Sequence, residues 1–103
     1  MKKLIQDHYD LIRQRVLITD HTTFDEFINK ITEEYQELID AYIDDVFVNE
    51  SPSDNTIHEI TDLIMVCLHC LNHFGVDFED ELKKNIEVQR KRVIYIGSKD
   101  IDS

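Results

Sequence analysis

The stretch Glu59-Ile-Thr-Asp-Leu-Ile-Met-Val-Cys-Leu-His-Cys-Leu71 decides the fold class of this 103-residue chain. Apolar side chains occupy nearly every position from residue 63 to residue 71, so a helix here is apolar on almost every side. Such a helix is normally buried against other helices. Its first turns nevertheless carry Glu59 and Asp62, and an unpaired carboxylate near a protein interior is costly.

A second acid pair with the same spacing, Glu34 and Glu37, lies 25 residues upstream. Acids three residues apart share one face of a helix, where like charges repel each other. A divalent cation between the pairs would relieve this repulsion, and Mg²⁺ or Mn²⁺ prefers such oxygen ligands. Lys30 is the only base among 17 acids from residue 20 to residue 81, so few protein cations are available instead.

Both acid pairs also have structural alternatives. Thr56 and Glu59 have the spacing of a capping box, which would give Glu59 a role at a helix N-terminus. Glu34 and Glu37 also fit the solvated face of a surface helix.

A zinc site is a further alternative on the same apolar helix. Asp62, His69 and His73 share one stripe, with Cys67 and Cys70 partly beside it. The glutamate of the HExxH pattern is missing and the cysteines fall in the apolar arc, so core packing is the favoured interpretation of these residues.

The whole chain predicts an all-α fold. Helical spacing and end signals predict helices over roughly residues 2–18, 24–46, 56–73 and 77–92, with 93–96 as a possible extension. Thr23 and Glu26 form a predicted capping box, and Gly75 is a predicted C-terminal cap. Short connections favour an antiparallel four-helix bundle, completed by oligomerisation. Residues 1–96 would form one domain, followed by a flexible tail over 97–103.

The net charge of −11 is unevenly distributed, because five of the 11 bases lie between Lys83 and Arg92. An acidic surface of this kind repels polymeric nucleic acid and anionic lipid, but permits a single nucleotide held through a metal and local bases. Met1-Lys2-Lys3 leads into an amphipathic segment, and the longest apolar run is too short for a membrane span. We therefore expect a cytoplasmic protein without a signal peptide or membrane contact.

The acid pairs belong to a longer pattern: Glu33-Glu34-Tyr-Gln-Glu37, a gap of 21 residues, then Glu59-Ile-Thr-Asp62. An apolar helix, a turn at Phe74-Gly-Val-Asp77 and a basic helix follow in that order. In this succession the chain resembles the MazG-like members of the all-α NTP pyrophosphohydrolase superfamily. The resemblance covers roughly residues 24–92.

The resemblance implies a magnesium-dependent hydrolase that cleaves a (deoxy)nucleoside triphosphate or related nucleotide between the α and β phosphates, giving a monophosphate and pyrophosphate. It implies Mg²⁺, with Mn²⁺ as a substitute, on four ligands: Glu34, Glu37, Glu59 and Asp62. Glu33 and Glu37 would be the catalytic carboxylates, with Glu33 orienting water. A homodimer or homotetramer is also implied.

The basic last helix would hold the outer phosphates of the substrate. Related sequences carry a Lys-Lys-x-Glu-x-Asn-x-x-Arg segment, and the corresponding candidates here are Lys84, Gln89 and Arg92. Gln89 replaces the more common asparagine and can make the same amide hydrogen bonds. The bases from Arg90 to Arg92 also fit simple complementation of the helix dipole.

A non-catalytic helical bundle that uses its acidic face to bind a metal or a protein partner is the alternative function. Arg13 and Arg15 are candidates for reaching the site of a neighbouring subunit, and the sequence leaves this open.

Overall fold

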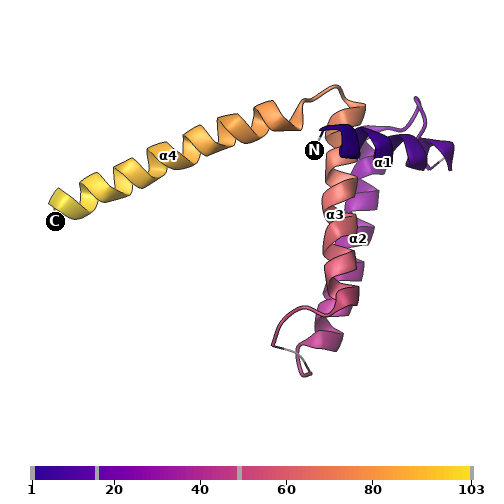
Figure 1. The fold of residues 1–103 in the computed structure, drawn as a ribbon, viewed down its shortest axis with the longest axis horizontal. Helices are drawn as coiled ribbons and strands as arrows, with labels where there is room; N and C mark the ends of the chain where they lie inside the picture. Colours follow the sequence, from indigo (N-terminus) through magenta and orange to yellow (C-terminus); the bar gives the residue numbers. More distant parts are fainter. Residues whose placement is uncertain (1, 16, 49, 103) are drawn as a thin grey trace.

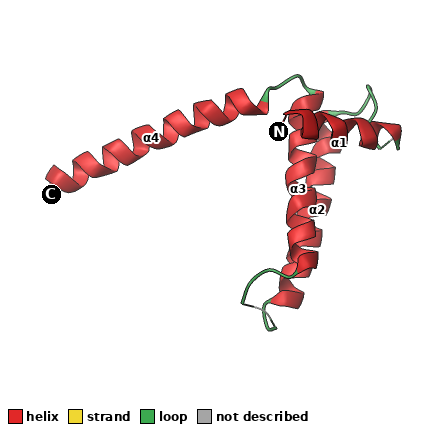
Figure 2. Ribbon diagram, in the orientation of Figure 1, coloured by secondary structure: helices red, strands yellow, loops and turns green. Residues whose placement is uncertain are grey.

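The protein consists of four helices, and the described residues contain no strand (Figure 1, Figure 2). The structure is a computed structural model that describes residues 2–15, 17–48 and 50–102. The helices are α1 (Lys2–Gln14), α2 (Phe24–Asp45), α3 (Asp54–His73) and α4 (Phe78–Asp102). The predicted all-α class is confirmed.

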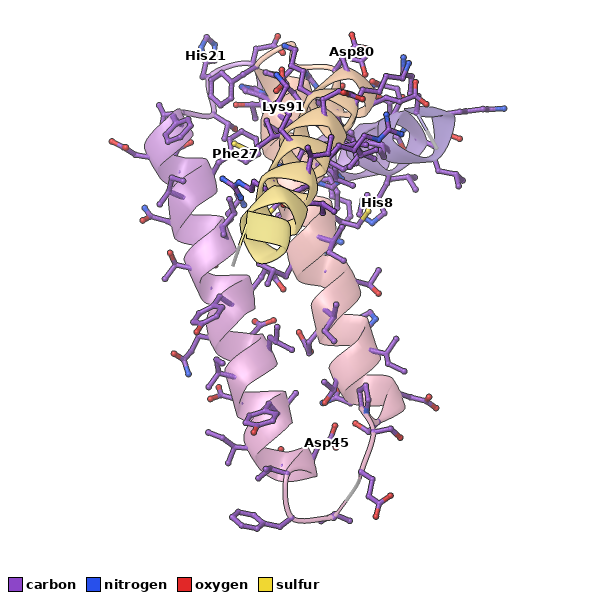
Figure 3. All side chains as sticks on the ribbon, turned by 90° about the vertical axis from the view of Figure 1, so that its left-hand side faces the viewer. His8, His21, Phe27, Asp45, Asp80 and Lys91 are labelled. Atoms are coloured by element: carbon purple, nitrogen blue, oxygen red, sulfur yellow. The ribbon has the colours of Figure 1, made fainter. Side chains whose placement is uncertain are left out.

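The antiparallel hairpin of α2 and α3 forms the centre of the fold, and α1 crosses its open end (Figure 1, Figure 3). Phe27 on α2 is fully buried at this crossing. It belongs to a cluster with Tyr9, Ile18 and Cys70, against which Ile12 packs. Because α1 supplies part of this cluster, the apolar core lies at one end of the hairpin.

Polar contacts also hold α1 on α3. His8 Nδ1 lies 2.9 Å from His69 Nε2, and the Tyr9 hydroxyl lies 3.0 Å from His73 Nδ1. His73 Nε2 is in turn 3.0 Å from the carbonyl oxygen of Thr22. Burial, and then the charge of His8, lowers the pKa of His69 to about 4. The environment between α1 and α3 therefore favours the neutral form of His69.

Capping decides where α2 begins. The Thr23 hydroxyl accepts a hydrogen bond from the Glu26 amide (3.2 Å), and the Glu26 carboxylate accepts one from the Thr23 amide (3.1 Å). The capping box predicted from the sequence is confirmed.

The start of α3 corrects a prediction that bears on the candidate site. Ser53 is the N-cap, so α3 begins at Asp54 rather than near Thr56. The Ser53 hydroxyl accepts from the Thr56 amide at 3.3 Å, and the Thr56 hydroxyl donates to the Asp45 carboxylate across the loop. The alternative interpretation of Thr56 and Glu59 as a capping box is therefore wrong, because the N-cap is Ser53.

The end of α1 also differs from the prediction. The helix ends at Gln14, four residues before Ile18, and the Leu17 amide donates to the Ile12 carbonyl at 3.2 Å. This turn carries Ile18 into the core, where its side chain is only 3% exposed. Helical spacing alone does not reveal a turn that is stabilised by tertiary burial.

Gly75 ends α3 in the left-handed conformation, with φ at 74°. Its amide donates to the Asn72 carbonyl (3.1 Å), and the Val76 amide donates to the Leu71 carbonyl (2.9 Å). These two hydrogen bonds form a Schellman motif, which confirms the predicted C-terminal cap.

α4 leaves the hairpin after its first turn (Figure 1). Lys2 Nζ pairs with Asp77 at 2.9 Å and with Glu79 at 3.2 Å, which ties α1 to the start of α4. From residue 79 to residue 94 every α4 side chain is exposed. The four helices therefore do not close into a bundle within one chain, and closure by another copy stays a prediction.

The backbone of α4 is helical through Asp102, beyond residue 96, where the sequence predicted that the domain ends. The helix thus includes most of the predicted tail. The flexibility predicted for 97–103 stays a prediction, and Ser103 lies outside the described residues.

Replacing Gly75 by alanine is expected to lower the free energy of unfolding by about 1 kcal/mol. A Cβ at this position would meet no atom within 4 Å, so the cost comes from the positive φ and not from a clash. Gly75→Asn should cost less, because asparagine tolerates this conformation better. Urea unfolding measures the stability of both variants. An alanine variant as stable as the parent would contradict the assignment of Gly75 as the C-terminal cap of α3.

Acidification is expected to destabilise the contact between α1 and α3 through His69. Its native pKa of about 4 lies below the ordinary 6.5, so the unfolded chain binds more protons between these values. The stabilisation is fully present above pH 6.5 and is lost as pH falls towards 4, by up to roughly 3 kcal/mol. Urea midpoints across this range should fall less for His69→Gln than for the parent. His21→Gln, at an exposed position, is the control, and equal slopes in all three proteins would contradict the prediction.

Candidate functional site

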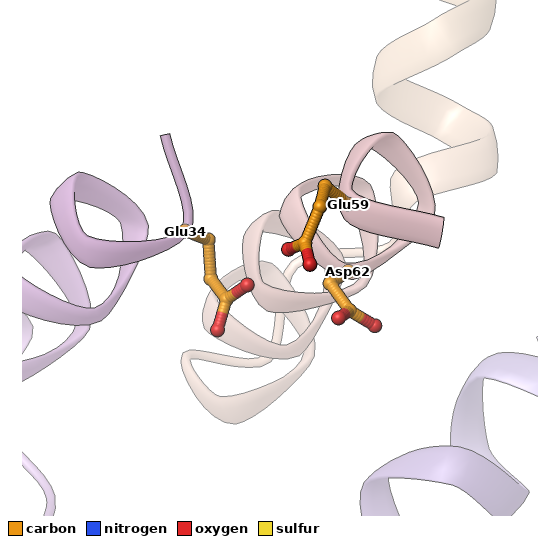
Figure 4. A group of neighbouring side chains, drawn as sticks. All are labelled: Glu34, Glu59 and Asp62. Carbon is orange, nitrogen blue, oxygen red and sulfur yellow. The ribbon is translucent and has the colours of Figure 1, made fainter. Parts of the chain in front are cut away.

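Three of the predicted metal ligands meet between α2 and α3. Glu34 projects from α2 towards Glu59 and Asp62 on α3 (Figure 4). One carboxylate oxygen of each residue lies within 4.8 Å of the others. The three-residue spacing on α3 places Glu59 and Asp62 on one face, and the hairpin brings Glu34 opposite them. We call these three residues the acid group.

The acid group contains two carboxylate oxygens that lack a partner. Glu34 Oε2 and Glu59 Oε2 are both buried and accept no hydrogen bond from the described part of the chain. Buried polar atoms in native proteins nearly always have a partner, and an unpartnered charge is costly. A hard divalent cation would satisfy both oxygens, so the residues present fit Mg²⁺ or Mn²⁺.

The pKa shifts in the acid group also agree with a site for a divalent cation. Burial raises the pKa of Glu34, and the charges of Glu37 and Asp62 raise it further. Burial likewise raises the pKa of Glu59, with Glu37 as the next cause. Glu37 is itself exposed and lies outside the group of three, so it flanks the other carboxylates.

A cleft of about 400 Å³ adjoins the acid group where α1 crosses the hairpin. Its polar lining includes Glu34 and Asp62 together with Glu33, which is exposed. His58 Nε2 lies 3.3 Å from Asp62 at the same place. The apolar side of the cleft is formed by Ile12, Leu17, Met65 and Val66. A small ligand in this cleft would therefore contact Glu34 and Asp62.

The sequence profile of the phosphoribosyl-ATP pyrophosphohydrolase family matches residues 6–91 of the chain. The chain belongs to this family. The family is part of the MazG-like all-α NTP pyrophosphohydrolase superfamily, which confirms the resemblance seen in the acid pattern. It supports a hydrolase of acid anhydrides that acts on a nucleotide-like substrate.

No curated protein and no solved structure gave a significant match to the chain. Among the described residues, no helix has both the length and the apolar content needed to cross a membrane.

The predicted phosphate-binding residues lie apart from the acid group within one chain. Lys84, Gln89 and Arg92 are exposed on α4, which extends away from the hairpin (Figure 1). Lys84 Nζ pairs with Glu81 at 3.1 Å. Their binding of phosphate stays a prediction, and one chain alone does not bring them to the acids.

The zinc alternative gains no support from the described residues. The imidazoles of His69 and His73 are engaged with His8 and with Tyr9, and burial raises the pKa of the Cys67 thiol. Both cysteines are unbridged. Sequence spacing missed the pairing of His8 with His69, because the two residues lie 61 positions apart.

Glu59→Gln is expected to raise the free energy of unfolding of the metal-free protein, because it removes one of the carboxylate charges that repel one another in the acid group. The same change should abolish the rise in thermal midpoint that Mg²⁺ gives the parent protein. Thermal unfolding with and without Mg²⁺ tests both statements. Glu50→Gln, which removes an exposed loop acid, should keep the Mg²⁺ shift. If neither Mg²⁺ nor Mn²⁺ changes the thermal midpoint of the parent protein, the prediction of a metal centre is contradicted.

Proposed function

We propose that the chain is a magnesium-dependent nucleotide pyrophosphohydrolase. It would cleave a (deoxy)nucleoside triphosphate, or a related nucleotide such as the phosphoribosyl-ATP of the family's name, to the monophosphate and pyrophosphate. The observation that carries the proposal is the acid group, with its two buried, unpartnered oxygens, at the edge of an open cleft.

The acid group would hold the metal, with Glu37 available at its exposed side. Bound Mg²⁺ would neutralise charge on the phosphates and increase the acidity of a water molecule, and Mn²⁺ accepts the same oxygen ligands.

Glu33 and Glu37 are the proposed general bases. Both carboxylates are exposed beside the acid group, and Glu33 also lines the cleft. A carboxylate in this position can accept the proton of a water that attacks the α phosphate, while pyrophosphate departs with the electrons of the broken P–O bond.

A homodimer or homotetramer is part of the proposal. Large apolar side chains are exposed along the hairpin: Phe24, Ile28, Tyr35, Tyr42, Ile43, Ile57 and Ile64. Exposed apolar side chains that gather into a patch mark an interaction site, and this number of them on one hairpin supports contact with another copy. A phosphate-binding role for Lys84, Gln89 and Arg92 would require such a neighbouring copy, because in one chain they lie away from the acids.

A cytoplasmic location agrees with the two unbridged thiols and with an intracellular nucleotide as substrate. Polymeric nucleic acid is not a proposed partner, because the net charge of −11 repels it.

Pyrophosphate release from a panel of NTPs, dNTPs and phosphoribosyl-ATP is expected to require Mg²⁺. Glu37→Gln and Asp62→Asn should each lower kcat by about 100-fold or more, since one removes a base and the other a metal ligand. Asp44→Asn, at an exposed position on α2, is the charge-matched control. If the parent protein releases no pyrophosphate from any substrate although Mg²⁺ stabilises it, the non-catalytic metal-binding bundle becomes the better assignment.

A further inference from the structure

Two basic side chains, Lys30 and Arg15, line the cleft that contains Glu34 and Asp62. Lys30 is half-buried on α2, and Arg15 is exposed in the connection that follows α1. We propose that Lys30 and Arg15 bind the phosphates of the substrate that leave as pyrophosphate. This inference rests on the proposed function, and it assigns the phosphate-binding role to other residues than the α4 bases predicted from the sequence.

Four of the other bases in the described part of the chain form ion pairs with carboxylates, whereas Lys30 and Arg15 do not. Arg13 pairs with Asp20 at 2.6 Å, and Arg90 pairs with Glu87 at 2.6 Å. Lys2 and Lys84 also have carboxylate partners. In the described part of the chain, neither Lys30 nor Arg15 lies within 4.0 Å of a carboxylate oxygen, although acids line the same cleft.

Placement on the helices explains how the bases and acids share the cleft. Lys30 lies three and four residues before Glu33 and Glu34, so all three side chains belong to one face of α2. Arg15 lines the cleft from the connection that follows α1, and Asp62 lines it from α3. The bases of the cleft thus come from two different segments of the chain, α2 and the connection after α1.

Charge balance favours an anionic ligand in this arrangement. Three ionised carboxylates and one Mg²⁺ have a net charge of about −1, which alone would repel a polyphosphate. Lys30 and Arg15 add two positive charges to the lining of the cleft. Arginine and lysine bind phosphate oxygens through charge-assisted hydrogen bonds, so a polyphosphate could contact the two bases and a metal on the acid group together.

Arg13 and Arg15, the candidates for reaching the site of a neighbouring subunit, have different surroundings within one chain. Arg13 is engaged by Asp20 and touches the Tyr9 ring, whose centroid lies 5.9 Å from its guanidinium carbon. Arg15 lines the cleft of its own chain and does not need a neighbouring subunit to reach an acid group.

Calorimetric titration of the full chain with inorganic pyrophosphate, in saturating Mg²⁺, tests the inference. Lys30→Gln and Arg15→Gln should each weaken pyrophosphate binding roughly tenfold, as expected for the loss of one charge-assisted hydrogen bond. Binding of Mg²⁺ alone should be unchanged or tighter, because a positive charge near the acids is removed. Lys30→Arg should retain most of the pyrophosphate affinity, and in turnover KM should rise more than kcat falls for both glutamine variants.

Lys91→Gln, which removes an exposed α4 base, is the control and should bind pyrophosphate like the parent. If Lys30→Gln and Arg15→Gln bind pyrophosphate normally while Lys84→Gln or Arg92→Gln binds it weakly, the phosphates are held by α4 and the inference is wrong. The proposed function survives that outcome. If the parent binds neither Mg²⁺ nor pyrophosphate, the proposed function is wrong and the inference fails with it.

Discussion

Three carboxylates face one another across α2 and α3, and their repulsion acts against the hairpin that holds them together. Packing elsewhere along the hairpin has to offset this cost. At one end Phe27 is fully buried under α1, and at the other end Asp45 accepts hydrogen bonds from Ser53 and Thr56. The acid group lies between the buried core at Phe27 and the hydrogen bonds to Asp45. A cation that removes the repulsion would therefore stabilise the whole hairpin, which couples metal binding to folding.

Local signals in the sequence correctly predicted the start of α2 and the end of α3. The capping box at Thr23 and the glycine cap at Gly75 are confirmed because each is built within a few residues. The convergence of the acids on α2 and α3 followed from their matched spacing on two helices joined by a short loop. The MazG-like superfamily was identified from the acid pairs together with the apolar helix, turn and basic helix that follow them, and the family match over residues 6–91 agrees with it.

Tertiary contacts account for the features that the sequence did not reveal. The Thr56 hydroxyl bonds to Asp45 across the loop, so the cap of α3 moves to Ser53 and the competing explanation for Glu59 disappears. Ile18 lies outside α1 because its side chain is buried in the core cluster with Phe27. The cleft itself depends on where α1 crosses the hairpin, a position that helical periodicity does not encode.

The crossing of α1 connects the core with the candidate site. His8 and Tyr9 fasten α1 to α3 through His69 and His73, and the next turns of the same segment supply the cleft wall and Arg15. Arg13 pairs with Asp20, and this ion pair joins the end of α1 to the connection that leads to α2. A loss of the α1 contacts would thus remove one wall of the cleft while leaving the acid group on the hairpin intact. The proposed metal binding and the proposed phosphate binding should therefore respond differently to changes in α1, because the acid group lies on α2 and α3, whereas Arg15 follows α1.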